Sequence, residues 1–90
     1  MPMTIPRDIR DEVERMRRLL RAVVRRSLLS ESEIERLAGL RDGELEVLFA
    51  GRTELRVAHV FCILRAIGIE PWKFFLDLRA EDGQGKHDAA

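Results

Sequence analysis

Apolar residues recur along the first third of the chain at the spacing of an amphipathic helix. They stand four, three, four and three positions apart, with arginines mainly flanking them. This pattern predicts one long helix, or two consecutive helices, between residue 7 and about residue 27. The apolar positions are Ile9, Val13, Met16, Leu20 and Val23.

Two shorter helices are predicted next, with a glycine between them. Ser30 and Glu33 have the spacing of a capping box, in which each side chain bonds the backbone N–H of the other. Gly39 permits a sharp turn because glycine tolerates positive φ. Asp42 is a candidate N-cap for the following helix, which we expect to stop at Gly51. The residues expected to face the core are Ile34, Leu37, Ala38, Leu45, Leu48 and Phe49.

The most apolar stretch follows, from about Leu55 to Ile67, and we expect this helix to run through the centre. Its apolar side chains, Val57, Val60, Phe61, Ile63, Leu64 and Ile67, cover more than half of its circumference. Gly68 ends it, and Pro71 suits the first turn of a last helix. We expect the core to be closed by Phe61, Leu64 and Phe74 or Phe75, with Trp72 and Leu76 or Leu78 also packed on it.

Length and composition favour one small all-α domain. Ninety residues with abundant aliphatic residues, Arg and Glu, few prolines and no Tyr favour helices over strands. The single cysteine excludes an internal disulfide, and no apolar run approaches the roughly 20 residues that span a bilayer. The N-terminus lacks the apolar region of a secretion signal. We therefore expect a cytoplasmic protein with no membrane partner.

The charges sum to zero but are sorted along the chain. Residues 15–26 hold six arginines and no acid, whereas residues 31–54 hold seven acids and three arginines. A strongly basic chain would point to nucleic acid, and this chain as a whole does not. The two runs have opposite signs, so they could attract each other between chains.

The segment from Leu20 to Phe75 resembles the DNA-binding domain of the XRE family, the Cro and lambda-repressor-like regulators. The matching stretches are "LRAV" at 20–23, "LSESEIERLAGL" at 29–40, Leu45, Leu48 and Gly51, and "ILRAIGIEPWKFF" at 63–75. The resemblance covers about 56 of the 90 residues. It implies an all-α, five-helix, lambda-repressor-like helix-turn-helix domain at 20–79, after an N-terminal helical extension at 1–19. The tail at 80–90 has no apolar anchor, and we expect it to be disordered.

In the family the second helix crosses the DNA backbone and the third lies in the major groove. By this resemblance Glu31 takes a phosphate-contacting position. The base-facing positions are Arg41, Asp42, Gly43, Glu44, Glu46 and Val47. Only Arg41 is a typical purine-reading donor, and the three acids are repelled by phosphates. The candidates to hold phosphates are Arg41, Arg52 and arginines of the first helix. The acids are equally well explained as a helix cap and as a solvent-exposed helix face.

Two functions follow as hypotheses. The first is a DNA-binding transcriptional regulator that acts as a dimer. The second is a protein-interaction or self-assembly module that kept the fold but lost DNA reading, with Val47 and the N-terminal stripe as contact surfaces. We expect a homo-oligomer, because the stripe extends beyond a minimal five-helix domain. Its candidate contact residues are Ile9, Val13, Met16 and Leu20.

No pattern in the chain indicates catalysis or a bound cofactor. His59 and Cys62 stand three positions apart, but a structural zinc site needs four ligands, and core filling is the favoured interpretation. No Ser, His and Asp arrangement supports nucleophilic catalysis. We expect a non-enzyme without metal or cofactor.

Overall fold

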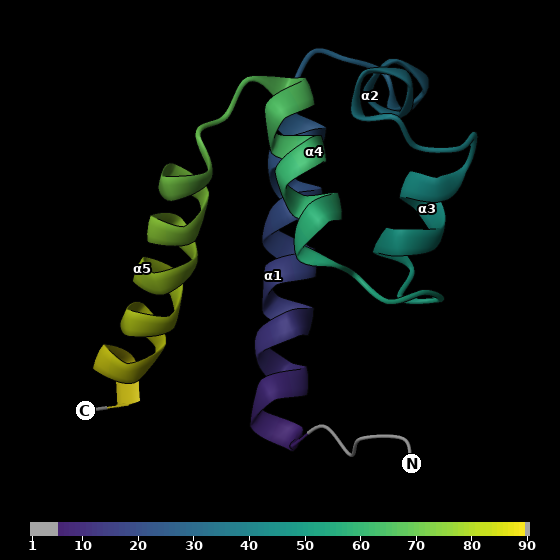
Figure 1. The fold of residues 1–90 in the computed structure, drawn as a ribbon. Coiled ribbons are helices and arrows are strands. Elements are labelled where there is room, and N and C mark those ends of the chain that lie inside the picture. The colour runs from purple at the N-terminus through teal and green to yellow at the C-terminus, as the bar shows by residue number, and fades with distance from the viewer. Residues whose placement is uncertain (1–5, 90) are drawn as a thin grey trace.

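The computed structural model describes the backbone of residues 6–89 and the side chains of residues 6–80. Over that range the chain forms five helices and no strand: α1 (Arg7–Arg26), α2 (Glu31–Ala38), α3 (Glu44–Phe49), α4 (Val57–Ile67) and α5 (Pro71–Ala89). Figure 1 shows the long α1 with α4 in front of its C-terminal half, α5 on one side, and α2 and α3 on the other. The predicted all-α class is confirmed.

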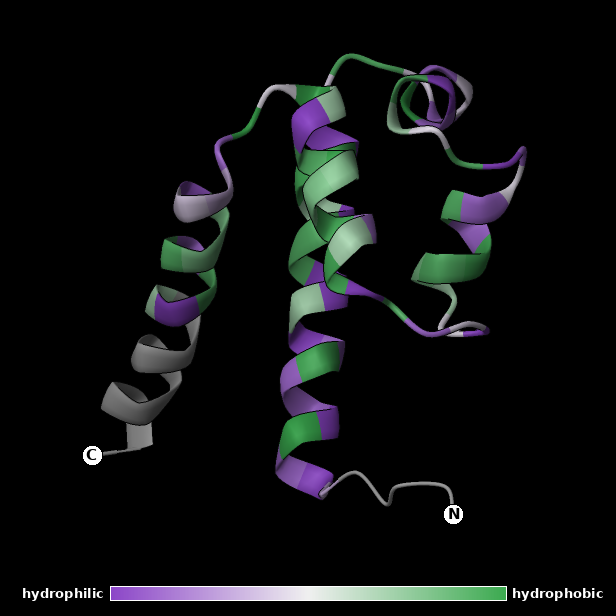
Figure 2. Ribbon diagram, in the orientation of Figure 1, coloured by the Kyte–Doolittle hydropathy of each residue, from purple (hydrophilic) through white to green (hydrophobic). Residues whose placement is uncertain are grey.

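All five helices contribute to one buried core. α2 packs mainly against α4, while α5 packs against both α1 and α4. Figure 2 shows that α4 is the most uniformly apolar of the helices, whereas the first turns of α1 are mostly hydrophilic. The buried apolar side chains are Leu20, Val23, Val24, Ile34, Leu45, Leu48, Val60, Ile63, Leu64, Phe74 and Leu78.

The bounds of α2 and the start of α5 follow the local signals in the sequence. The capping box of Ser30 and Glu33 is present at the start of α2. Gly39 ends α2 with a φ of 74°, a left-handed conformation that suits glycine because in other residues it brings the Cβ too close to the carbonyl oxygen that follows it in the backbone. Pro71 begins α5, as predicted. α1 is one continuous helix, so no break separates the proposed extension at 1–19 from the domain that follows; residues 1–5 lie outside the described range.

Several apolar side chains that we expected in the core lie on the surface instead. Phe61 is 44 % exposed, Leu37 59 % and Trp72 61 %, so these predictions are wrong. α4 is apolar around more than half of its circumference, but its neighbours cover only one side. Val60, Ile63 and Leu64 occupy that covered side. Of the alternatives left open for α5, Phe74 and Leu78 are buried, Phe75 is half-buried and Leu76 is exposed.

Helix α5 also differs from the expectation at its far end. Its backbone is helical to Ala89, so residues 80–89 form a helix where we expected the segment at 80–90 to be disordered; Ala90 lies outside the described residues. No proline lies between Trp72 and Ala89, and once a helix is nucleated each further residue adds a hydrogen bond.

Candidate functional site

The α2–turn–α3 unit, where the XRE resemblance places DNA contacts, begins with a tightly capped helix. The Ser30 N–H donates to Glu33 Oε1 at 3.0 Å, and the Glu33 N–H donates to Ser30 Oγ at 3.2 Å. The backbone N–H and the hydroxyl of Ser30 lower the pKa of the Glu33 carboxyl from its ordinary value of 4.5, and Arg36 acts in the same direction. The first turn of α2 therefore carries its own carboxylate at the place where a phosphate would approach.

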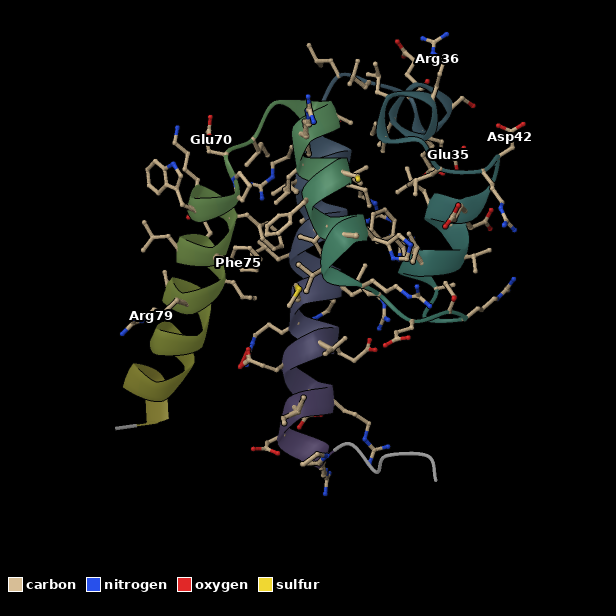
Figure 3. The ribbon with its side chains drawn as sticks, in the orientation of Figure 1. Glu35, Arg36, Asp42, Glu70, Phe75 and Arg79 are labelled. Atoms are coloured by element: carbon tan, nitrogen blue, oxygen red, sulfur yellow. The ribbon has the colours of Figure 1, made fainter. Side chains whose placement is uncertain are left out.

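A buried carboxylate that the sequence analysis missed connects α2 to α3. Glu35 is only 4 % exposed, and its Oε2 accepts a hydrogen bond from the Leu45 N–H at 3.0 Å. Figure 3 shows Glu35 between the two helices. The N-cap of α3 is Gly43, which has no side chain to accept this bond, so Glu35, ten residues before Leu45, supplies the acceptor instead. No signal in the sequence indicated this role of Glu35, because the predicted N-cap was Asp42, which carries an acceptor of its own.

Two acids around the start of α3 do not have the roles that we predicted for them. Asp42 is exposed and is not the N-cap, because the cap position falls on Gly43, with a φ of 82°. Glu44 Oε1 accepts a hydrogen bond from the Arg41 N–H at 2.8 Å. Its Oε2 lies 3.6 Å from His59 Nε2. Glu44 is thus directed toward its own chain and not toward a base-facing surface.

His59 and Cys62 do not fill the core as predicted. Cys62 is exposed, and His59 is half-buried at the start of α4. His59 Nδ1 accepts a hydrogen bond from the Arg56 N–H at 3.1 Å, so the imidazole caps its helix. Within the described residues no group of three or more potential metal ligands is found.

The other predicted base-facing residues lie partly together. Arg41, Asp42, Gly43, Glu44 and Val47 line one surface hollow, whereas Glu46 lies outside it, as does Arg52, the predicted phosphate-holding residue. Val47 is half-buried, and Arg41, Asp42, Gly43, Glu46 and Arg52 are exposed. The exposed charges from residue 31 to residue 56 are five acids and four arginines, so this surface is close to neutral. They are Glu31, Glu33, Asp42, Glu46 and Glu54, and Arg36, Arg41, Arg52 and Arg56.

The predicted self-association stripe on α1 is largely used within the chain. Leu20 is fully buried, so it is not available to a partner, and Met16 is half-buried against the same core. Val13 is half-buried, and only Ile9, at 50 %, is substantially exposed. The stripe continues from the core helix without a break, which is why its C-terminal part is inside the domain.

A different apolar surface lies on the outward side of α4. Val57, Ala58, Phe61 and Cys62 are all exposed, and we call them the α4 face. Phe75 of α5 borders it, with its ring edge-on to Phe61 at a centroid distance of 6.2 Å. On the other border, Leu37 of α2 lines one surface hollow together with Cys62 and Arg65.

No protein family model, curated protein or solved structure matches the chain. The XRE-type helix-turn-helix assignment therefore stays a prediction from the residues quoted above. Among the described residues, no helix has both the length and the apolar character needed to cross a membrane.

Proposed function

We propose that this chain is a helix-turn-helix protein of the XRE type that works as a self-associating interaction module. The observation that carries the proposal is the α4 face. It leaves Val57 and Phe61, from the most apolar helix, 64 % and 44 % exposed, and the exposed Leu37 lies at its border. Monomeric proteins in water rarely expose contiguous apolar patches of this kind, and such patches are typical of interaction sites.

The surface around α3 supports the same proposal, because its charges do not favour DNA binding. Asp42 and Glu46 are exposed acids, and Glu44 is occupied by the Arg41 N–H. DNA binding depends on neutralising phosphates, and a nearly neutral surface that exposes acids such as Asp42 and Glu46 releases few counterions. These residues therefore favour a protein that keeps the helix-turn-helix fold but does not read DNA bases over one that does.

A second copy of the chain is the partner that fits the α4 face. A two-fold contact puts the same patch on both sides, so apolar faces meet each other. Arg65 is exposed beyond one end of the face, and the side chain of Glu54 is 78 % exposed beyond the other. If two copies of α4 meet antiparallel, Arg65 of each approaches Glu54 of the other. Opposite charges in these positions set the direction of the pairing.

The molar mass in solution tests this proposal. Light scattering at tens of micromolar is expected to give a dimer for the unmodified protein and a monomer for Phe61→Glu. The matched control is Leu76→Glu, which places the same charge on an exposed leucine of α5 and should keep the dimer. An unmodified protein that is monomeric at this concentration, or a Phe61→Glu variant that keeps its mass, contradicts the proposal.

DNA-binding regulation is the second candidate function. It is supported by the XRE resemblance and by the exposed Arg41 and Arg52 on either side of α3. A selection from random duplexes at low salt tests it, and Arg41→Ala should then relax the preference at one base pair by about 1–3 kcal/mol. Recovery of no enriched sequence, with binding no better than about 0.1 mM, excludes this function.

A further inference from the structure

A hollow of about 360 Å³ lies where the C-terminal ends of α1 and α4 meet the first two turns of α5 (Figure 1). Pockets that bind small molecules measure roughly 300–1,000 Å³. The apolar part of its lining belongs to the core, because Val23 is buried and Ile67 and Ile69 pack against the core cluster. An aliphatic group in this hollow therefore exchanges water for apolar side chains.

The rest of the lining carries charges of both signs. Arg26 and Lys73 are exposed cations, and Asp77, one helical turn after Lys73, is an exposed anion. Among residues 6–80 the structure gives none of the three an ion-pair partner. The three charges around the hollow are therefore available to a ligand.

The polar groups of the hollow also keep free hydrogen-bonding capacity. Arg26 Nε donates at 3.4 Å to the carbonyl four residues before it, and this bond leaves the two terminal nitrogens of the guanidinium free to bind a ligand. Lys73 Nζ lies 5.6 Å from the centroid of the Trp72 ring, and such a contact is weak at an exposed site. The Ser27 hydroxyl donates to the Val24 carbonyl at 2.7 Å, so its oxygen can still accept a hydrogen bond.

We propose that this hollow binds a free α-amino acid with an aliphatic side chain. Arg26 and Lys73 donate hydrogen bonds to its carboxylate, Asp77 and the Ser27 oxygen accept hydrogen bonds from its ammonium group, and its side chain covers the apolar part of the lining. A simple carboxylate leaves Asp77 unpaired beside it, and a simple amine leaves both cations unpaired. The hollow shares no residue with the α4 face, so the inference is independent of self-association.

Amide NMR spectra of the full chain, titrated with L-leucine, test the inference. The signals of Ser27, Ile69 and Lys73 should shift together and saturate with a Kd of about 1 mM, a strength that suits a ligand of few atoms on an open surface. Isocaproate, which is leucine without its amine, and isoamylamine, which is leucine without its carboxylate, should each bind about tenfold more weakly, because each loses charge-assisted hydrogen bonds. Glycine, which has no aliphatic side chain, should also bind about tenfold more weakly.

The variants separate the two ends of the ligand. Asp77→Asn should weaken leucine binding about tenfold and should not weaken isocaproate binding, whereas Lys73→Gln should weaken both. The matched control is Arg79→Gln, which removes an exposed cation of α5 outside the hollow and should change neither. Circular dichroism first establishes that each variant is folded.

Three results overturn the inference. The first is the absence of a saturable shift with leucine up to about 10 mM, well above the expected Kd. The second is binding of isocaproate or glycine as tight as that of leucine. The third is an Asp77→Asn variant that binds leucine as the unmodified protein does.

Discussion

Replacing Glu35 by alanine should loosen the attachment of α3 to α2. The substitution removes the carboxylate that accepts the Leu45 N–H at 3.0 Å, and Leu45 is fully buried. A buried donor left without an acceptor costs about 1–3 kcal/mol, and hydrogen bonds to charged groups lie in the upper part of that range. We expect Glu35→Ala to lower the free energy of unfolding by about 2–3 kcal/mol. That is a large share of the roughly 5–13 kcal/mol typical of a domain of this length.

Urea titration of two matched variants isolates this contribution. Glu35→Gln keeps an acceptor oxygen and should lose only about 1 kcal/mol. Glu46→Ala removes an exposed acid of α3 and should change the stability by less than about 0.5 kcal/mol. Hydrogen exchange of the Leu45 amide should accelerate in Glu35→Ala alone. If Glu35→Ala loses no more than Glu46→Ala, the buried carboxylate does not hold α3 and the reasoning fails.

Further predictions follow from burial, backbone conformation and titration. Phe74→Ala should cost about 3–5 kcal/mol in denaturant titration, because Phe74 is 1 % exposed. Phe61→Ala should cost clearly less under the same monomeric conditions, and equal losses would contradict the observed exposure. Gly39→Ala should cost about 1–2 kcal/mol in the same assay, since a φ of 74° disfavours a Cβ even though nothing lies within 4 Å of it; an unchanged midpoint would argue against the left-handed turn. The pKa of Glu33 in the folded protein lies below its ordinary value of 4.5. The stability that Glu33 adds relative to Glu33→Gln should therefore be complete above pH 4.5 and disappear as the pH falls through the folded pKa. A stability difference that persists in stronger acid would be inconsistent with the capping bonds.

The bounds of α2 and the start of α5 could be predicted from the sequence because their signals are local, whereas the predicted N-cap of α3 was wrong. The capping box of Ser30 and Glu33, the left-handed Gly39 and the initial Pro71 each act within a few residues of their own position. Such short-range chemistry needs no knowledge of how the helices pack. The five-helix order followed from these signals together with the apolar period.

The orientation of α4 could not be predicted in the same way. Periodicity reveals which positions are apolar, but it does not reveal how much of a helix its neighbours cover. Phe61 and Val60 are adjacent apolar residues of one helix, yet one is 44 % exposed and the other 1 %. The difference depends on where α1, α2 and α5 lie, which is a property of the assembled domain.

The candidate site was misjudged where acids had partners far along the chain. Glu35 and Glu44 belong to an acidic run that has the sequence pattern of a solvated face. Glu35 accepts a hydrogen bond from a residue ten positions away, and Glu44 lies beside His59 of another helix. These contacts explain part of the acidic run by the stability of the α2–turn–α3 unit, while Asp42 and Glu46 stay exposed.

Cross-linking through Cys62 tests the self-association of the α4 face most directly. Cys62 is exposed within that face and is the single cysteine of the chain, so a short thiol-to-thiol reagent can join only two copies. We predict rapid formation of a covalent dimer at micromolar concentration, lost in Phe61→Glu and kept in Leu76→Glu. A protein that stays monomeric with the reagent, or that cross-links equally well after Phe61→Glu, would contradict the account.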